Sequence, residues 1–275
     1  MKSFLEIYDL ATATSRTILT HDGVIEAPNW DPAGTSLLVN GGGLLYRVPL
    51  DAPKLTAVNS GFATRCNNDH GISPDGKTIV LSNHRAKGSE IFTLPAAGGE
   101  PKLISPDAPC WWHGWSPDGK RLAYVAARGG NRVIDVYTIG IEGGAEVRLT
   151  HGEGHCDGPD YSADGAQIYY NCDRDGHAQI WAMNTDGTNQ HKLFADAYVN
   201  WFPHPSPDGQ HLLYLAYPPG TTGHPANLQV ALCLATATGE NRRRILEFTG
   251  GQGTINVPCW SPDATAFAYV RYQPD

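Results

Sequence analysis

The stretch PHPSPDG at residues 203–209 is one of six similar segments spread along the chain. In its last four residues, proline fixes φ at the second turn position, aspartate tolerates the third, and glycine accepts the positive φ that follows. The stretch therefore predicts a tight turn between two strands. The other copies are PNWDPAG (28–34), HGISPDG (70–76), HGWSPDG (113–119), PDYSADG (159–165) and PCWSPDA (258–264).

Successive copies lie 42 to 55 residues apart, a period that matches a four-stranded propeller blade. An alternating apolar run follows each turn, as in KTIVLSN and RLAYVAA, and a third run, a second glycine-rich turn and a fourth run come next. Each repeat thus predicts four antiparallel strands. The expected blades occupy about residues 24–58, 66–104, 110–150, 155–194 and 199–248.

The two ends of the chain supply the sixth blade. The last repeat, at about 254–273, has room for only two strands, and residues 4–20 read as a third and a fourth strand without a first and second. Pairing these ends closes the ring and removes exposed sheet edges. We expect an all-β, six-bladed β-propeller that forms a single domain over residues 1–275. An open six-part solenoid is disfavoured because no distinct capping repeat occurs.

Composition narrows the functional classes. The formal net charge of -8 argues against nucleic-acid binding, and no apolar stretch is long enough to insert into a membrane. Residues 1–16 lack the apolar core of a secretory signal, so a cytoplasmic protein is expected, and a periplasmic one only if a leader was removed. The six cysteines show no CxxC pair and are interpreted as reduced, small apolar residues.

The motifs DRDG (173–176) and MNTDG (183–187), together with the WSPDG-type turns, resemble the six-bladed propeller of the TolB family over essentially the whole chain. The resemblance implies a binding role toward proteins or peptides. Similar propellers precede the catalytic domain of some serine peptidases, but no GxSxG motif occurs here.

A second, more distant resemblance concerns FPHPSPDG at residues 202–209. It is similar to a motif of oligogalacturonate lyases, propellers that hold a divalent metal through His and Gln side chains near the axis. This resemblance implies a metal role for His204. In addition, His70 and His113 share the position three residues before the motif serine in neighbouring blades, where imidazoles could converge on a metal.

The position five residues before the motif serine varies from blade to blade, whereas a purely structural position would repeat one residue type. Carboxylates and amides suit hydrogen bonding to a sugar or peptide, and indoles suit stacking. The alternative is that these side chains only hydrate a water-filled channel. The candidate ligand-binding residues are Glu26, Asn68, Trp111, Asp157, Trp201 and Asn256, with Arg65, Asp69 and Trp112 beside them. Strand alternation predicts that His204 points away from this set, and His224 reads as an ordinary loop residue.

Three hypotheses follow from these patterns. The first is a binding protein without a cofactor, which takes a peptide or small carbohydrate at one mouth of the channel. The second is a metal-dependent carbohydrate-active enzyme, a polysaccharide or oligosaccharide lyase with His70, His113 and His204 as ligands. The third is a protein-interaction scaffold. The long loop at residues 217–227 is either a partial lid over the channel mouth or a tolerated surface insertion.

Overall fold

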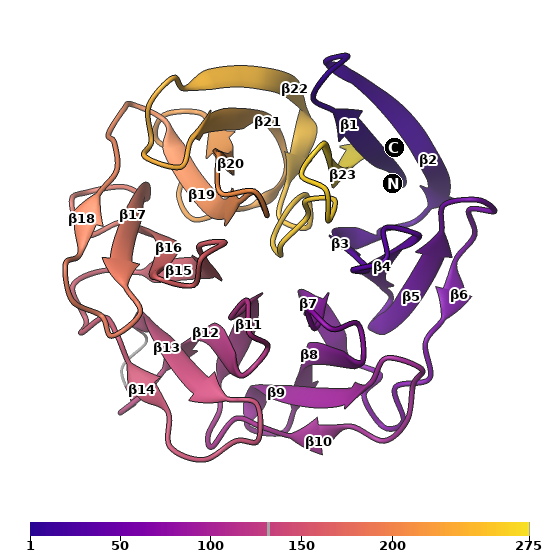
Figure 1. Ribbon diagram of the computed structural model, residues 1–275, viewed down its shortest axis with the longest axis horizontal. Coiled ribbons are helices and arrows are strands. Elements are labelled where there is room, and N and C mark those ends of the chain that lie inside the picture. Colours follow the sequence, from indigo (N-terminus) through magenta and orange to yellow (C-terminus); the bar gives the residue numbers. More distant parts are fainter. Residues whose placement is uncertain (131–132, 275) are drawn as a thin grey trace.

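The computed structural model of the chain describes residues 1–130 and 133–274. Every regular element within these residues is a β-strand. Six small sheets stand around a central axis like the blades of a propeller, and the chain runs through them in order (Figure 1). The all-β, six-bladed fold predicted from the repeat is therefore confirmed. No helix in the described part of the chain has the length and apolar character needed to cross a membrane.

Five of the blades contain four antiparallel strands each, with the first strand innermost. Blade 1 comprises β3 (Glu26–Trp30), β4 (Ser36–Gly41), β5 (Leu44–Pro49) and β6 (Thr56–Ala57). Blade 2 comprises β7 (Cys66–Ile72), β8 (Thr78–Arg85), β9 (Gly88–Pro95) and β10 (Lys102–Leu103). Blade 3 comprises β11 (Cys110–Trp115), β12 (Arg121–Ala127), β13 (Ile134–Gly140) and β14 (Val147–Arg148). Blade 4 comprises β15 (Cys156–Tyr161), β16 (Gln167–Cys172), β17 (Gln179–Asn184) and β18 (His191–Lys192). Blade 5 comprises β19 (Val199–Pro205), β20 (His211–Tyr217), β21 (Ala226–Thr236) and β22 (Arg243–Gly251).

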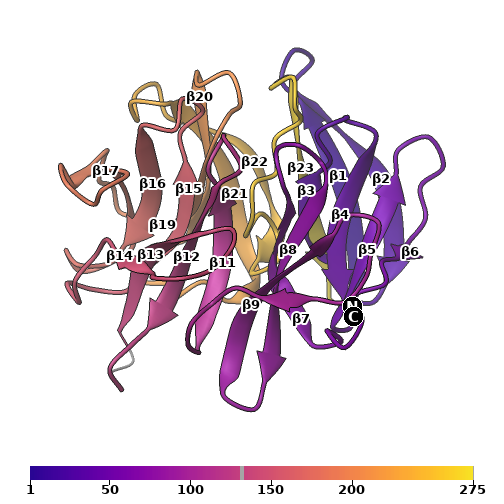
Figure 2. The same cartoon turned by 60° about the horizontal axis from the view of Figure 1, so that its bottom comes forward.

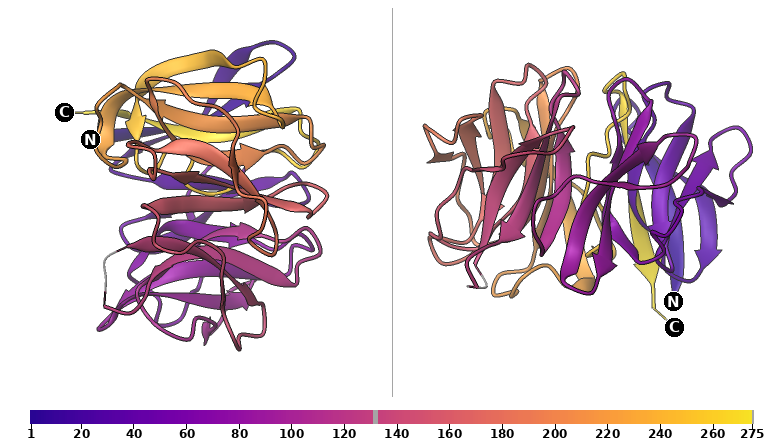
Figure 3. Two further views of the ribbon diagram at one scale, coloured as in Figure 1. Left: turned by 90° about the vertical axis from the view of Figure 1, so that its left-hand side faces the viewer. Right: turned by 90° about the horizontal axis from the view of Figure 1, so that it is seen from below.

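The sixth blade joins the two ends of the chain. β1 (Lys2–Asp9) pairs with β2 (Thr14–Asp22) on one side and with β23 (Ala266–Gln273) on the other, so the ring closes as predicted (Figure 3). The expected innermost strand from residue 254 does not form. Residues 254–260 make one isolated bridge, between Trp260 and Phe267, and two further main-chain hydrogen bonds to β23.

The repeated turn is held by a local hydrogen-bond pattern that explains its sequence. In blade 3 the Ser116 hydroxyl donates to Asp118 Oδ1 at 2.7 Å, and the same oxygen accepts the Lys120 amide at 3.0 Å. Gly119 follows at φ +69°, a conformation that glycine adopts without steric cost. The equivalent Ser–Asp pairs are Ser73–Asp75, Ser162–Asp164, Ser206–Asp208 and Ser261–Asp263. Because the pattern needs only a few adjacent residues, it recurs wherever the motif occurs.

Residues 254–258, called the axial segment below, enter the central channel (Figures 1 and 2). Side chains from three alternate blades hold its carbonyl groups. Asn29 of blade 1 donates to Pro258 O at 2.7 Å, His113 of blade 3 to Asn256 O at 3.2 Å, and His204 of blade 5 to Ile255 O at 2.6 Å. The axial segment is thus tied to blades 1, 3 and 5 by side-chain hydrogen bonds to three of its carbonyl groups.

The apolar side chains of the axial segment pack into blades on different sides of the ring. Ile255 lies in a core cluster with Phe202 of blade 5, and Val257 lies in another with Ala27 of blade 1 and Trp112 of blade 3. Both apolar residues of the segment are fully buried. Burial of such side chains stabilises by roughly 1.5–3 kcal/mol each, so packing and hydrogen bonds together hold the segment in place.

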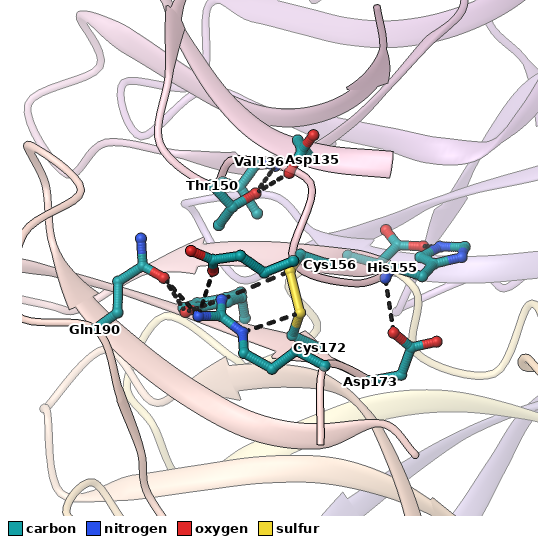
Figure 4. Close-up of a disulfide and its surroundings, with 12 residues drawn as sticks. Asp135, Val136, Thr150, His155, Cys156, Cys172, Asp173 and Gln190 are labelled. Carbon is teal, nitrogen blue, oxygen red and sulfur yellow. Dashed lines mark hydrogen bonds and ion pairs between the residues drawn. A yellow bond between two sulfur atoms is a disulfide. The ribbon is translucent and has the colours of Figure 1, made fainter. Parts of the chain in front are cut away.

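One pair of cysteines departs from the sequence interpretation. Cys156 and Cys172 stand directly opposite each other on β15 and β16 and form a disulfide (Figure 4). The remaining four, Cys66, Cys110, Cys233 and Cys259, are free and buried, as expected. The register shift between Asp157 and Asp160 sets the two cysteines opposite each other, so counting outward from the turn at 162–165 would not have paired them.

Candidate functional site

A cavity of about 450 Å³ opens at one mouth of the ring, above the axial segment. The starts of the innermost strands contribute most of its lining. The side chains around it are Glu26, Asn67, Asn68, Asp69, His84, Trp111, His113, Val125, Ile134, His155, Asp157, Phe202, His224, Gln252 and Asn256. Because Asn256 belongs to the axial segment and Gln252 lies two residues before its start, this segment forms part of the floor.

A β-bulge in each innermost strand of blades 1 to 5 directs these side chains. The pairing register shifts just after the position five residues before the motif residue in blades 1, 4 and 5, one residue later in blade 3, and between Cys66 and His70 in blade 2. Ala27, Gly158 and Phe202, at the next position in their blades, have φ between +53° and +59°. A bulge adds one residue on one strand and so ends the strict alternation of faces. Beyond the bulge, the face on which a side chain lies can no longer be predicted from the alternation of every second residue.

Seven of the sequence-predicted residues line the cavity. They are Glu26, Asn68, Asp69, Trp111, His113, Asp157 and Asn256. The structure places the other five elsewhere: Arg65, His70, Trp112, Trp201 and His204.

Trp112 and Trp201 are both buried in the core. The Trp112 ring packs so closely on Gly71 of blade 2 that a Cβ at that glycine would collide with it. Trp201 stands behind the cavity wall, with its ring centroid 4.4 Å from that of His224 and 5.6 Å from that of His155. Each tryptophan therefore supports the wall without lining the cavity.

His70 and His204 are buried away from the cavity. Burial lowers the pKa of His70 to about 4, so its imidazole is neutral. His204 faces oxygen acceptors with both ring nitrogens, Asp160 Oδ2 at 3.0 Å and Ile255 O at 2.6 Å. Alternation predicted that His204 points away from the candidate ligand-binding set; it lies outside the cavity, and after the bulge that follows Trp201 it faces the axial segment.

Arg65 has an exposed side chain and joins the structure near the cavity only through its main chain. Its amide nitrogen donates to Asn83 Oδ1 at 2.8 Å.

Three imidazoles surround the carboxylate of Asp157. Its oxygens lie 3.0 Å from His113 Nε2, 3.2 Å from His155 Nε2 and 3.7 Å from His224 Nε2. His113 Nδ1 faces Asn256 O, so both ring nitrogens of His113 face acceptors. An imidazole donates from both nitrogens only when it is protonated. The geometry therefore assigns His113 as an imidazolium bound to a carboxylate.

The acid–base behaviour agrees with this assignment. Burial alone would lower the pKa of His113, but the hydrogen bond and charge of Asp157 outweigh it and raise the pKa to about 9. Burial alone would raise the pKa of Asp157. The hydrogen bonds from His113 and His155 outweigh burial and hold the pKa of Asp157 well below its usual value. The pair is ionised at neutral pH.

Glu26 and Asp69 form a second acidic group without such a partner. Burial raises the pKa of Asp69 to about 7, opposed by the charge of His113 and reinforced by that of Asp157. Burial also raises the pKa of Glu26, whose carboxylate accepts only from the amides of Asn40 and Asn68. Neutral amides compensate a buried charge less well than a cation does.

The three histidines proposed as metal ligands do not converge. His113 and His204 each direct both nitrogens at other acceptors, and His70 lies outside the cavity. Among the residues that the structure describes, no group of three or more His, Cys, Asp or Glu is arranged to hold a metal ion. As placed, this donor set does not fit a metal.

Sequence reasoning missed several residues of the cavity, notably His155, His224 and Gln252. His224 was read as an ordinary loop residue. In the structure the loop at 217–227 brings its ring against Trp201 and Phe202, and its Nδ1 bonds Gln252 Oε1 at 2.5 Å. The unusual length of this loop was the available signal. His155 is placed by its own main chain, whose amide donates to Asp173 Oδ1 at 2.7 Å (Figure 4).

Comparison with known proteins identifies the family. A family model described as the TolB beta propeller domain matches residues 107–227. Uncharacterized protein Atu1656 of Agrobacterium fabrum is 46% identical over 276 residues, which cover all of this chain and 94% of that protein. A solved structure from Agrobacterium tumefaciens, provisionally named TolB, superposes with a TM-score of 0.97 at 46% identity, covering 100% of this chain and 99% of the other. The chain belongs to the TolB-like β-propeller family.

More distant structures share the fold of this TolB-like propeller. TolB from Acinetobacter baumannii has a TM-score of 0.69 at 19% identity, over 91% of this chain and 64% of that one. An oligogalacturonate lyase in complex with manganese has a TM-score of 0.55 at 14% identity, over 90% of this chain and 67% of that one. At these identities the likeness concerns the propeller architecture only.

Proposed function

We propose that this TolB-like propeller is a binding protein whose cavity takes a short peptide or a small carbohydrate. The observation that supports it best is the cavity itself. About 450 Å³ of space stands over a closed floor, lined by polar side chains that differ from blade to blade. This volume lies within the range of small-ligand sites. Loops held by a rigid ring are a common setting for such sites.

The electrostatics of the cavity favour binding as well. The charges of His113 and Asp157 are fixed by their mutual hydrogen bond, so neither is free to act as a mobile acid or base at neutral pH. Trp111 offers an indole face at the wall, the residue type that sugars and peptide side chains stack upon. A preorganised set of acceptors beside an apolar wall suits recognition.

Calorimetry and thermal unfolding with a panel of short peptides and mono- and disaccharides test this proposal. A ligand that binds raises the melting temperature, and Trp111→Leu and Asn68→Ala weaken its affinity by about 10-fold or more. Trp30→Leu is the matched control, because Trp30 lines a groove beside the repeated turns rather than the cavity. Ligand responses that persist unchanged in the two cavity variants would place binding elsewhere.

The metal-dependent enzyme remains the alternative hypothesis, and the scaffold hypothesis is a third. Metal analysis of the purified protein addresses the first of these. One equivalent of divalent metal, lost in a His70→Ala, His113→Ala double variant, would favour an enzyme over a metal-free binding protein. Cleavage of an oligogalacturonate by the wild-type protein would do so directly. A protein partner that binds equally well to Trp111→Leu would favour a scaffold.

A further inference from the structure

We infer that the ligand of this cavity carries a primary ammonium group, held against Asp69, Asn68 and Glu26; this inference rests on the binding function proposed above. The three side chains lie together on one side of the cavity and offer oxygen acceptors toward it. The opposite acidic residue, Asp157, is already neutralised by its histidine partners.

The first support is a set of acceptors, on two largely buried residues, that receive no donor from the described protein. Asp69 is 5% exposed, and its Oδ2 accepts from Asn67 Nδ2 at 2.6 Å. Its Oδ1 accepts no hydrogen bond from any residue that the structure describes. Asn68 is 4% exposed and donates to Glu26 Oε1 at 3.4 Å, while its own Oδ1 likewise accepts none within the described chain. Both oxygens remain accessible from the cavity, where water or a ligand can donate to them, and an ammonium supplies three N–H groups.

The second support is the charge balance. None of the described residues lining the cavity is a lysine or an arginine. Among the described lining residues, His113 is assigned as an imidazolium by its two acceptors, and it is bound to Asp157 at 3.0 Å. Glu26 and Asp69 therefore have no cation of their own, and burial raises the pKa of both. A ligand cation would compensate these carboxylates, whereas a neutral sugar would not.

The apolar side chains of the cavity indicate the chemistry of the rest of the ligand. Trp111, Val125 and Ile134 line the cavity beside the acceptors, and Phe202 closes it further on. Apolar side chains provide no ligand atoms for a hydrated metal ion, whereas the burial of a hydrocarbon group against them is favourable. The chemistry recognised is thus an amine carried on an apolar group. Two kinds of ligand carry such a group: a peptide, through its amino terminus, and a free alkyl amine.

Isothermal calorimetry at pH 7.5 with four probes separates these sources. They are Leu-Gly-Gly, N-acetyl-Leu-Gly-Gly, isopentylamine and galactose. The inference requires that a free amine bind at least about 10-fold more tightly than the acetylated peptide, because acetylation removes the charge and two donors. Tighter binding of Leu-Gly-Gly than of isopentylamine identifies a peptide terminus. The reverse order identifies a small amine.

Variants locate the ammonium. Asp69→Asn and Glu26→Gln each weaken amine binding by about 10- to 100-fold while the folded state persists, since each removes a charge and keeps the shape. Asp51→Asn is the matched control, because Asp51 is exposed and distant in sequence from every cavity residue. Thermal unfolding of each variant confirms that the fold is retained.

Three results would overturn the inference. Equal affinity for the free and acetylated peptides would show that the charge is not recognised, although the binding function would stand. A higher affinity for galactose than for the amines would also show that the charge is not recognised, while the binding function would stand. Tight binding of Mn²⁺ or Ca²⁺ alone, abolished by Asp69→Asn, would assign the carboxylates to a metal. Failure of every probe to bind would contradict the proposed function together with this inference.

Discussion

His113 Nε2 lies 3.0 Å from Asp157 Oδ1, across the boundary between blades 3 and 4. Both side chains are buried, and the other nitrogen of His113 holds the Asn256 carbonyl of the axial segment. A single imidazolium thus connects two blades and the floor of the cavity. The stability of the ring and the shape of the site depend on the same contact.

The pH dependence of stability follows from this imidazolium. The pKa of His113 is about 9 in the folded protein and about 6.5 in an unfolded chain. Because the pKa of His113 is higher in the folded state, its protonation stabilises the folded protein fully below pH 6.5. This stabilisation is lost as the pH rises through about 9. We expect the melting temperature to fall between pH 7.5 and 9.5. Because the pKa of Asp69 is about 7, the fall above about pH 8 is the part that reports His113.

His113→Gln is expected to flatten this pH profile, and the exposed His191 provides the matched control as His191→Gln. Differential scanning calorimetry across the range measures both. An equally steep fall in His113→Gln would mean that another group causes it.

Asp157→Asn is expected to lower the free energy of unfolding by about 3–5 kcal/mol, because it leaves the buried charge of His113 without its carboxylate. Urea denaturation measures the loss. Glu142→Gln, in the exposed pair with Lys102 at 2.8 Å, is the control and should change stability by less than about 1 kcal/mol. A loss below about 1 kcal/mol in Asp157→Asn would contradict an ionised pair.

Gly71→Ala is expected to destabilise the protein by about 1–3 kcal/mol, because the new methyl group collides with the Trp112 ring in the next blade. Gly140→Ala, at a strand end where the nearest atom would lie 3.6 Å from the new Cβ, should be neutral or slightly stabilising. Equal effects of the two substitutions in chemical denaturation would refute the close packing at Gly71.

Thiol titration tests the disulfide. The native protein should show almost no reactive thiol, since Cys66, Cys110, Cys233 and Cys259 are buried and burial raises the pKa of each. Denaturation without reductant should expose four thiols, and reduction should raise the number to six. Six thiols before reduction would mean that Cys156 and Cys172 are not bonded.

The fold followed from the sequence because its determinants are local. Ser116, Asp118 and Gly119 make their turn with hydrogen bonds spanning at most five residues, so the motif carries its structure wherever it occurs. The closure of the ring also followed, since it needs only a count of strands at each end.

Only part of the candidate site could be predicted from the sequence. The variable position before each turn led to Asp157 and Asn256, but the bulge that follows Trp201 and brings His204 to the axial segment leaves no reliable trace in the sequence. The partners of His113 and His204 lie up to 143 residues away, in a segment that the repeat pattern assigned to an ordinary strand. Contacts of that range are set by the closed ring, and no local pattern reports them.

The axial segment also has a temporal consequence. Synthesis proceeds from the amino terminus, so blades 1 to 5 emerge from the ribosome before residues 254–258 exist. Until then Asn29, His113 and His204 lack the carbonyls that they hold, and the cavity lacks part of its floor. The cavity is therefore completed in the same step that seals the ring. A chain truncated before residue 254 would present five blades around an incomplete cavity.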